Sequence, residues 1–243
     1  MKVSICIATH DKPLLLRNTL ESIVCQDPGF EWESIVVDDG SPDQETYNVC
    51  SDYTKVHYVR LGKHSYANPA PARNVAYRRA KGEVVIAQSD DVIHYSPDCI
   101  KQLVGQLCTG SFVIARVVNV DGNGNTCCDP AGSGYGDRLN VYTGREKPRP
   151  LFFLGSLYRR DLYAVGGNDE EFTNPSGEDR WFGMCLTNGL GLKPLYSDDI
   201  VGHHQMHPHC APSVIGLSQR LVKTKERQAR ATGIWQSSRG PWI

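Results

Sequence analysis

The chain has 243 residues, of which 40% are hydrophobic and 22% are charged, and its formal net charge is −1. This balance is ordinary for a folded globular protein and excludes the broadly basic surface of a general nucleic-acid binder. No apolar run approaches the ~20 residues of a membrane span, and the apolar part of the N-terminus is too short for a secretory signal. None of the nine cysteines forms a CxxC pair, so we expect reduced thiols and a cytoplasmic location.

The first half of the chain alternates short apolar runs with helical patterns. Short apolar strands that alternate with helices predict a parallel sheet covered on both faces. A polar helix is expected between the second and third strands. A later helix, at 71–81, is expected to stop at Gly82. The strands are expected at 3–8, 34–37, 56–61 and 84–87, and the other helices at 12–25, 71–81 and about 98–107, the last capped by Ser96-Pro97-Asp98.

Polar side chains follow three of these strands: Thr9-His10-Asp11, Asp38-Asp39-Gly40 and Ser89-Asp90-Asp91. In open α/β sheets, ligands bind beyond the carboxyl ends of the strands, so the three segments should meet at one crevice. Two adjacent carboxylates after a buried strand are costly to desolvate unless a cation or a good donor meets them. The sequence therefore predicts a site that holds something positive, although each aspartate alone is also a common turn residue.

The second half has a different pattern. A long strand is expected at 112–120, a short helix at about 161–165, and another helix from about 177. Residues 121–150 are rich in Gly, Asn, Asp and Pro. A structureless stretch of that length predicts a lid or a binding loop, mobile without ligand.

The known nucleotide-binding loops are missing, because neither GxGxxG nor GxxxxGK[ST] occurs in the chain. Phosphates would then have to be neutralised by a metal and by arginine. A hard divalent cation prefers carboxylate oxygens and accepts phosphate oxygens as further ligands. The "SDD" segment supplies the carboxylates, and Arg73 supplies a charge-assisted donor.

Several motifs of the chain resemble those of a known family. "SICIATHDKPLLLRNTLESI", "IVVDDGSPD", "PARNVAYRRAKGEVVIAQSDD", "VGGNDEEF" and "GED" occur in that order, as in inverting glycosyltransferases of family 2. The resemblance spans residues 3 to about 209 and implies the GT-A fold, an α/β Rossmann-like domain with a mixed central sheet flanked by helices. It implies one domain at 1–216, with a nucleotide-sugar half (1–110) and an acceptor half (111–216), before a basic C-terminal helix or tail at 217–243.

The resemblance also implies roles for single residues at the donor side. In the family, the first strand end contacts the nucleoside, the second aspartate of "VDDGS" binds the base, typically uracil, and the "SDD" segment matches a DxD-type motif. Ser89 departs from a strict DxD and leaves two carboxylates for the ion. The implied contacts are Thr9 and Asp11 to the nucleoside, Asp39 to the base, Arg73 near base and phosphates, Asp90 to the ribose, and Asp91 to Mn²⁺ or Mg²⁺.

The acceptor side carries two further motifs. "GED" resembles the family's ED motif, in which Asp179 would be the general base and Glu178 would orient the acceptor. "VGHHQMHPH" would supply the third metal contact; His204 fits the family pattern best, and His203 and His207 stay open. A separate zinc site made by these histidines with Cys210 is a rival interpretation.

The resemblance thus implies an enzyme that moves a sugar, with inversion, from a nucleotide-sugar (UDP-linked) to a hydroxyl of a glycan or lipid-linked acceptor. The alternatives are a retaining GT-A enzyme and a catalytically inactive nucleotide-sugar binder. From Leu217 to Ile243 there are six basic residues against one acidic residue, 6 − 1 = +5. This stretch is interpreted either as a solvated helix or as a peripheral contact with a membrane surface or an anionic glycan.

Overall fold

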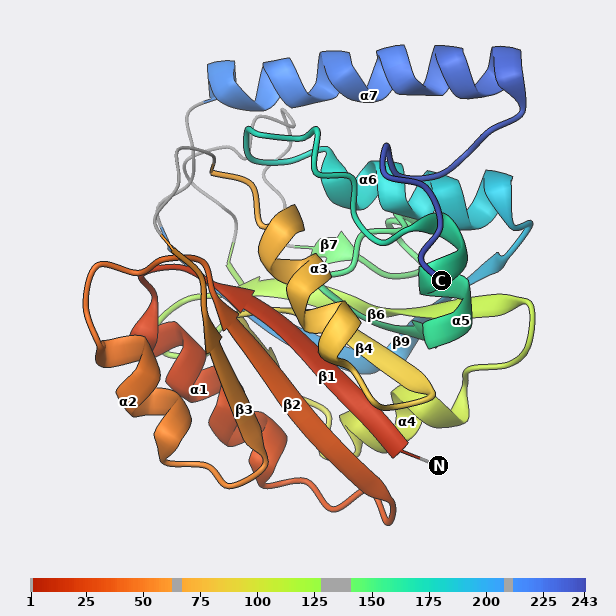
Figure 1. Cartoon of the computed structure of the whole chain (residues 1–243). Helices are drawn as coiled ribbons and strands as arrows, with labels where there is room; N and C mark the ends of the chain where they lie inside the picture. The colour runs from red at the N-terminus through yellow and green to blue at the C-terminus, as the bar shows by residue number, and fades with distance from the viewer. Residues whose placement is uncertain (1, 63–66, 128–140, 208–211) are drawn as a thin grey trace.

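The computed structural model of the chain describes residues 2–62, 67–127, 141–207 and 212–243. A single mixed sheet runs through the molecule in the order β3-β2-β1-β4-β8-β6-β9-β5, with β7 paired to β6 (Figure 1). The strands are β1 (Lys2–Thr9), β2 (Glu31–Asp38), β3 (Val56–Arg60), β4 (Val84–Ser89), β5 (Val92–His94), β6 (Ser111–Val120), β7 (Val141–Thr143), β8 (Leu154–Tyr158) and β9 (Lys193–Gln205).

Strands β1 to β4 are parallel, as their sequence predicts. Strand β8 then runs antiparallel to both β4 and β6, and β9 runs parallel to β6. The sheet is therefore mixed, as expected for a GT-A fold. The helices are α1 (Pro13–Val24), α2 (Glu45–Ser51), α3 (Ala70–Arg79), α4 (Cys99–Gly105), α5 (Arg159–Val165), α6 (Glu178–Met184), the π-helix η1 (Cys185–Gly189) and α7 (Pro212–Thr232).

Strand side chains alternate between two cores, one on each face of the sheet. Val3, Ile5 and Ile7 of β1 pack with α1, α2 and α4, whereas Cys6 and Ala8 pack with α3, α5, α6 and α7. Both faces are thus covered, which explains why these strands are continuous apolar runs rather than alternating ones.

Two local expectations about helix ends are wrong. Helix α3 ends at Arg79, before Gly82. Gly82 is instead needed because β1 passes close by: a Cβ there would lie 2.6 Å from the Ser4 backbone nitrogen. Helix α4 begins at Cys99, and Asp98 makes no side-chain capping hydrogen bond.

The expected loop at 121–150 is also partly wrong. It contains strand β7, whose Val141 and Tyr142 are buried, and Tyr142 belongs to a hydrophobic core. A bridge between Val120 and Thr126 orders its first part. Residues 128–140 lie outside the described ranges, so the expected mobility stays a prediction there.

Helix α7 crosses one side of the molecule and begins before the expected boundary at 216 (Figure 1). Every helix in the described ranges is too short or too polar to traverse a lipid bilayer. The cysteines described in the structure are free thiols.

Candidate active site

The three polar strand ends meet at one edge of the sheet, as predicted. In the strand register, Thr9 lies opposite Asp38, and Ala8 lies opposite Ser89. The Thr9 hydroxyl donates a 2.8 Å hydrogen bond to Asp90 Oδ2, and the Asp39 amide donates to the Thr9 carbonyl at 2.8 Å. Residues 9, 39 and 90 are therefore held together by direct contacts.

Two aspartates at these strand ends, Asp38 and Asp11, have different environments. Asp38 is fully buried and accepts hydrogen bonds from the Tyr58 hydroxyl (2.6 Å) and the Ser41 amide (2.8 Å). Its carboxylate stabilises the turn after β2. Asp11, by contrast, is exposed, and its amide donates to Ser41 Oγ at 2.9 Å. The turn that carries Asp11 is thereby fixed against the one that carries Asp39.

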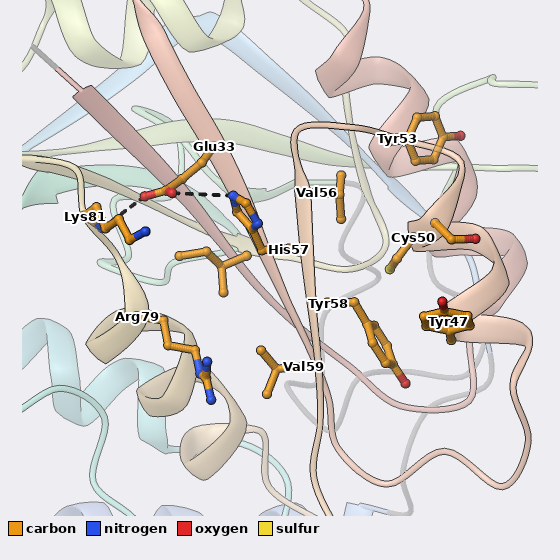
Figure 2. Close-up of a pocket in the computed structure, with 12 residues that line it drawn as sticks. Glu33, Tyr47, Cys50, Tyr53, Val56, His57, Tyr58, Val59, Arg79 and Lys81 are labelled. Atoms are coloured by element: carbon orange, nitrogen blue, oxygen red, sulfur yellow. Dashed lines mark hydrogen bonds and ion pairs between the residues drawn. The ribbon is translucent and has the colours of Figure 1, made fainter.

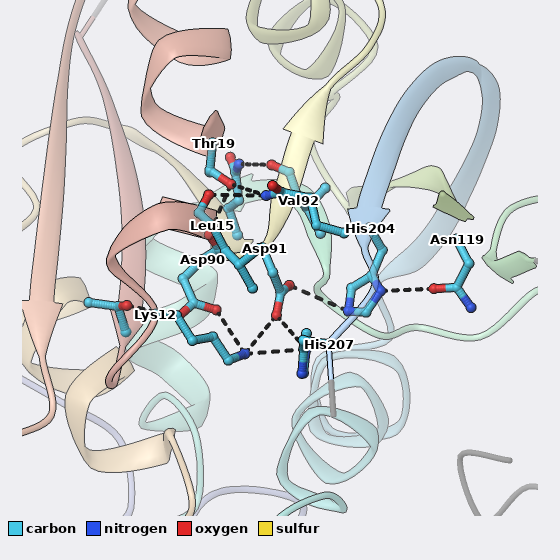
Figure 3. Close-up of polar contacts among 12 residues, drawn as sticks. Lys12, Leu15, Thr19, Asp90, Asp91, Val92, Asn119, His204 and His207 are labelled. Carbon is cyan, nitrogen blue, oxygen red and sulfur yellow. Dashed lines mark hydrogen bonds and ion pairs between the residues drawn. The ribbon is translucent and has the colours of Figure 1, made fainter. Parts of the chain in front are cut away.

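Asp91, His204 and His207 place one ligand atom each within 4.8 Å of one another. His207 Nε2 lies 2.9 Å from Asp91 Oδ2, and His204 Nε2 lies 3.5 Å from Asp91 Oδ1 (Figure 3). Asn119 Oδ1 contacts His204 Nδ1 at 2.8 Å. Because an amide oxygen accepts a hydrogen bond, Nδ1 carries a proton toward Asn119, and this contact directs Nε2 toward Asp91, the orientation found in metal-ligating histidines.

These residues fit a divalent cation. Asp91 is 2% exposed, and among the described residues no hydrogen-bond donor reaches its Oδ1 atom. A buried carboxylate oxygen without a donor is costly unless a cation binds it. Two ligands at about 2.1 Å and at right angles stand about 3.0 Å apart, close to the 2.9 Å between Asp91 Oδ2 and His207 Nε2. A carboxylate oxygen suits Mn²⁺ or Mg²⁺ and an imidazole nitrogen suits first-row transition metals, so the mixed set fits a first-row divalent cation.

Sequence reasoning missed Lys12, which lies inside this cluster. Its Nζ atom is 2.8 Å from Asp91 Oδ2, 3.5 Å from Asp90 Oδ1 and 3.3 Å from His207 Nε2 (Figure 3). A lysine before the proline that opens a helix resembles an ordinary solvated residue. The available signal was its position directly after the first polar strand end.

The two neighbouring carboxylates differ in acidity. Burial raises the pKa of Asp90 to about 6, although the Lys12 ammonium acts in the opposite direction. Burial would also raise the pKa of Asp91, but His204, His207 and Lys12 together outweigh it and hold the pKa well below its usual range. Asp91 is therefore the carboxylate that stays ionised most readily.

His203 lies apart from the cluster formed by Asp91, His204 and His207. It neighbours His204 on β9, so its side chain points to the other face of the sheet. There it stacks on Tyr95 with 3.9 Å between ring centres. Of the three candidate histidines, the geometry favours His204 and His207. Cys210, which the rival zinc interpretation needs, lies outside the described residues.

Arg73 and the "GED" segment line the same pocket as Asp91 and the two histidines. The Arg73 guanidinium forms an ion pair with the Asp179 carboxylate and lies 3.5 Å from Glu178 Oε1. Asn68, also missed from the sequence, donates a 3.0 Å hydrogen bond to Glu178 Oε2. Burial, followed by the Asp179 carboxylate, raises the pKa of Glu178 to about 7, although Arg73 acts in the opposite direction.

The backbone before Glu178 is in a conformation that L-residues rarely adopt. Ser176 has φ 74° and Gly177 has φ 95°. Among the described non-glycine residues, only Ser176 and Asp11 (φ 51°) have positive φ, and both lie beside the site. Such strain persists where the surrounding structure fixes it, and it clusters at functional sites.

A pocket of about 280 Å³ joins the two groups; its lining includes Lys12, Arg73, Asp91, Tyr142, Arg149, Glu178, Asp179, His204 and His207. A larger hollow of about 780 Å³ lies over the edge strand β3 (Figure 2). That hollow contains one carboxylate, Glu33, already ion-paired to Lys2 at 3.3 Å. The smaller pocket, with its converging carboxylates and histidines, is the candidate active site.

A mixed sheet of this order, with acidic strand ends facing a candidate metal triad, defines the GT-A class of glycosyltransferases. A family model described as "Glycosyl transferase family 2" matches residues 4–164. The chain belongs to this family, which confirms the family and enzyme class expected from its motifs.

Relatives by sequence cover parts of the chain. It is 28% identical over 195 residues to the uncharacterized protein y4gI of Sinorhizobium fredii, which is 70% of this chain and 21% of that protein. It is 34% identical over 98 residues to the poly(ribitol-phosphate) beta-N-acetylglucosaminyltransferase TarS of Staphylococcus aureus, 39% of this chain and 17% of that protein. The chain thus spans about a fifth of the length of these relatives.

Solved structures share the fold over nearly the whole chain. TarS 1–349 of S. aureus in complex with UDP has a TM-score of 0.66 at 21% identity, covering 93% of this chain and 65% of that one. The mannosyltransferase PcManGT of Pyrobaculum calidifontis, in complex with GDP-Man and Mn²⁺, has a TM-score of 0.64 at 22% identity, covering 94% and 64%. At this identity the likeness shows the GT-A fold alone.

Proposed function

We propose that this chain transfers a sugar from a nucleotide-sugar, UDP-linked, to a hydroxyl of a glycan or lipid-linked acceptor, with metal dependence and inversion. One observation carries the proposal: the candidate metal residues and the candidate base Asp179 line the same pocket. A donor diphosphate on one side would leave the anomeric carbon between it and an acceptor held by the other side.

The donor is assigned to the strand ends. Thr9, Asp11 and Asp39 would bind the nucleoside, and Asp90 the ribose, because hydrogen bonds among these turns hold them together. Similarity to proteins solved with UDP, UDP-GlcNAc and GDP-Man supports a nucleotide-sugar. Arg73 was expected near the base and phosphates; its ion pair with Asp179 favours a position between donor and acceptor instead.

Asp91, His204 and His207 would hold Mn²⁺ or Mg²⁺, which would neutralise charge on the departing diphosphate. Asp179 would accept the proton of the acceptor hydroxyl as that oxygen attacks the anomeric carbon. Arg73 would keep the Asp179 carboxylate oriented, and Glu178 would contact a further acceptor hydroxyl. A single displacement of this kind inverts the anomeric carbon, whereas a retaining reaction would leave Asp179 without a chemical role.

The test is a panel of nucleotide-sugars assayed for hydrolysis and transfer with MnCl₂ and with EDTA. We expect one donor to be consumed only with the metal, which would also separate an enzyme from an inactive binder. Asp91→Asn should then abolish metal-dependent UDP binding in calorimetry while the fold is kept. Asp98→Asn is the matched control, because Asp98 is exposed and its side chain caps no helix. Unchanged metal-dependent affinity in Asp91→Asn would refute the metal assignment.

A further inference from the structure

Lys12 occupies the place where a divalent cation is expected. Its ammonium donates to Asp91 Oδ2 at 2.8 Å, and this same oxygen lies 2.9 Å from His207 Nε2. Asp90 and Asp91 are 5% and 2% exposed, so their charges are shielded little by solvent. Of the lysines and arginines in the described part of the chain, Lys12 is the one that forms ion pairs with Asp90 and Asp91.

The ammonium and a divalent cation would oppose each other in this cluster. Both are positive, both would bind Asp91 Oδ2, and the buried setting strengthens the repulsion between them. With Lys12 in place, the two carboxylates are already partly neutralised. A divalent cation must therefore either displace the ammonium or bind weakly beside it.

The Lys12 side chain can move to a second position in the same pocket. It is 29% exposed, lines the candidate pocket, and stands at the flexible end of a four-carbon stem just before α1. A diphosphate bound through the metal would bring new negative charge to this pocket. That charge would offer the ammonium a second partner as the cation takes the first.

We propose that Lys12 is a built-in counter-cation of Asp90 and Asp91, which a divalent cation displaces and which then binds the donor diphosphate. This inference rests on the proposed function. It makes metal and diphosphate binding cooperative beyond their direct contact, because the diphosphate stabilises the displaced lysine. By linkage, each ligand must then strengthen the other by the same factor.

The test measures binding rather than turnover. Titrations of MnCl₂ into protein, with and without saturating UDP, would be followed by calorimetry in wild type, Lys12→Met and Lys12→Arg. We expect Lys12→Met to bind Mn²⁺ alone about tenfold more tightly than wild type. In this variant, UDP should raise the Mn²⁺ affinity much less than it does in wild type. Lys12→Arg keeps the charge and should behave like wild type. Lys101→Met, at an exposed position on α4, is the control.

The outcomes separate this inference from the proposed function. Equal Mn²⁺ affinity and equal UDP effect in wild type and Lys12→Met would overturn the inference and leave the metal site standing. Absence of Mn²⁺ binding in all variants, even with UDP, would overturn both. If Lys12→Met does not fold, as judged by circular dichroism, Lys12→Gln replaces it, because the amide keeps a hydrogen-bond donor without the charge.

Discussion

Glu178 and Asp179 are adjacent carboxylates with different surroundings. Glu178 is 4% exposed and accepts a hydrogen bond from Asn68, whereas Asp179 forms the close ion pair with Arg73. The ion pair with Arg73 orients the Asp179 carboxylate, as its proposed role of general base requires. Glu178 combines burial with a raised pKa, which suits a group that positions an acceptor hydroxyl.

Asp179→Asn should reduce transfer by roughly 10²–10⁴-fold, the usual contribution of a general base. Donor affinity should change little, because the proposed role of Asp179 is toward the acceptor hydroxyl. The measurements are initial rates with donor and acceptor, and calorimetry with UDP and MnCl₂. The anomeric coupling of the product in NMR should show inversion; a retained configuration, or a variant with near-full transfer, would contradict the assignment.

Glu178 should also make stability depend on pH. Its pKa is about 7 in the folded protein, above the ordinary value of 4.5. The folded state therefore binds the proton more tightly, and the stability that Glu178 contributes is present below pH 4.5 and lost as pH rises through 7. The difference in free energy of unfolding between wild type and Glu178→Gln should fall between pH 5 and 8 in urea titrations. A difference that is constant with pH would refute the raised pKa.

At the scale of elements, residues 233–243, the segment after α7, contact several helices and hold them together. Ser238 donates a 2.7 Å hydrogen bond to Asp169, and the Trp181 indole donates to the Gln236 carbonyl at 3.3 Å. The Arg78 guanidinium lies over the Trp242 ring, with Cζ 4.3 Å from the ring centre. Because Arg78 is on α3 and Trp181 is on α6, the segment links the two helices that carry Arg73 and Asp179.

Gly166 makes this docking possible. A Cβ there would lie 2.0 Å from the Gly240 carbonyl oxygen, and its φ is +78°. Gly166→Ala should lower the free energy of unfolding by roughly 2–4 kcal/mol, from left-handed strain plus displacement of the segment.

Gly191→Ala separates the two effects, because Gly191 has φ +68° with nothing within 4 Å of its Cβ position. It should cost only about 1 kcal/mol. Urea unfolding of both variants is the measurement. Equal costs would show that the packed C-terminal segment adds no stability at Gly166.

At the scale of the whole molecule, ion pairs neutralise part of the positive charge of residues 217–243. Less of this charge is therefore available at the surface than the sequence count suggests. Lys225 is 8% exposed and forms ion pairs with Asp169 (2.9 Å) and Glu171. Arg230 pairs with Glu226, and Arg239 with Glu170. The charges that can attract an anionic surface are chiefly those of Arg220, Lys223 and Arg227, which helical spacing places on one side of α7.

If α7 contacts a membrane surface, neutralising these residues together (Arg220→Gln, Lys223→Gln, Arg227→Gln) should weaken binding to phosphatidylserine vesicles at least about tenfold. The reason is that each basic residue near an anionic surface contributes attraction that falls with added salt. Sedimentation with vesicles at two salt concentrations is the measurement.

A control of equal charge uses exposed residues elsewhere, Lys101→Gln, Arg160→Gln and Lys193→Gln. Similar losses in both triple variants would show that net charge, rather than α7, governs vesicle binding. No vesicle binding by the wild type would instead favour a solvated helix.

The sequence alone determined the features that depend on short stretches of chain. Apolar runs predicted β1 to β4, and the polar residues after them predicted that Thr9, Asp39 and Asp90 would meet, because parallel strands end at one edge of the sheet. The ordered motifs identified the family. These inferences succeeded because each strand and its following turn are local, and the topology of such units is limited.

Only the tertiary structure decided which distant side chains share one space. Asp91 and His204 meet because β5 pairs antiparallel with β9, with Val92 opposite His204. The same packing puts Lys12 against Asp91, Arg73 against Asp179, and a strand inside the expected loop at 121–150. Periodicity along the chain carries no record of these pairings, because they depend on which elements pack together and at which register.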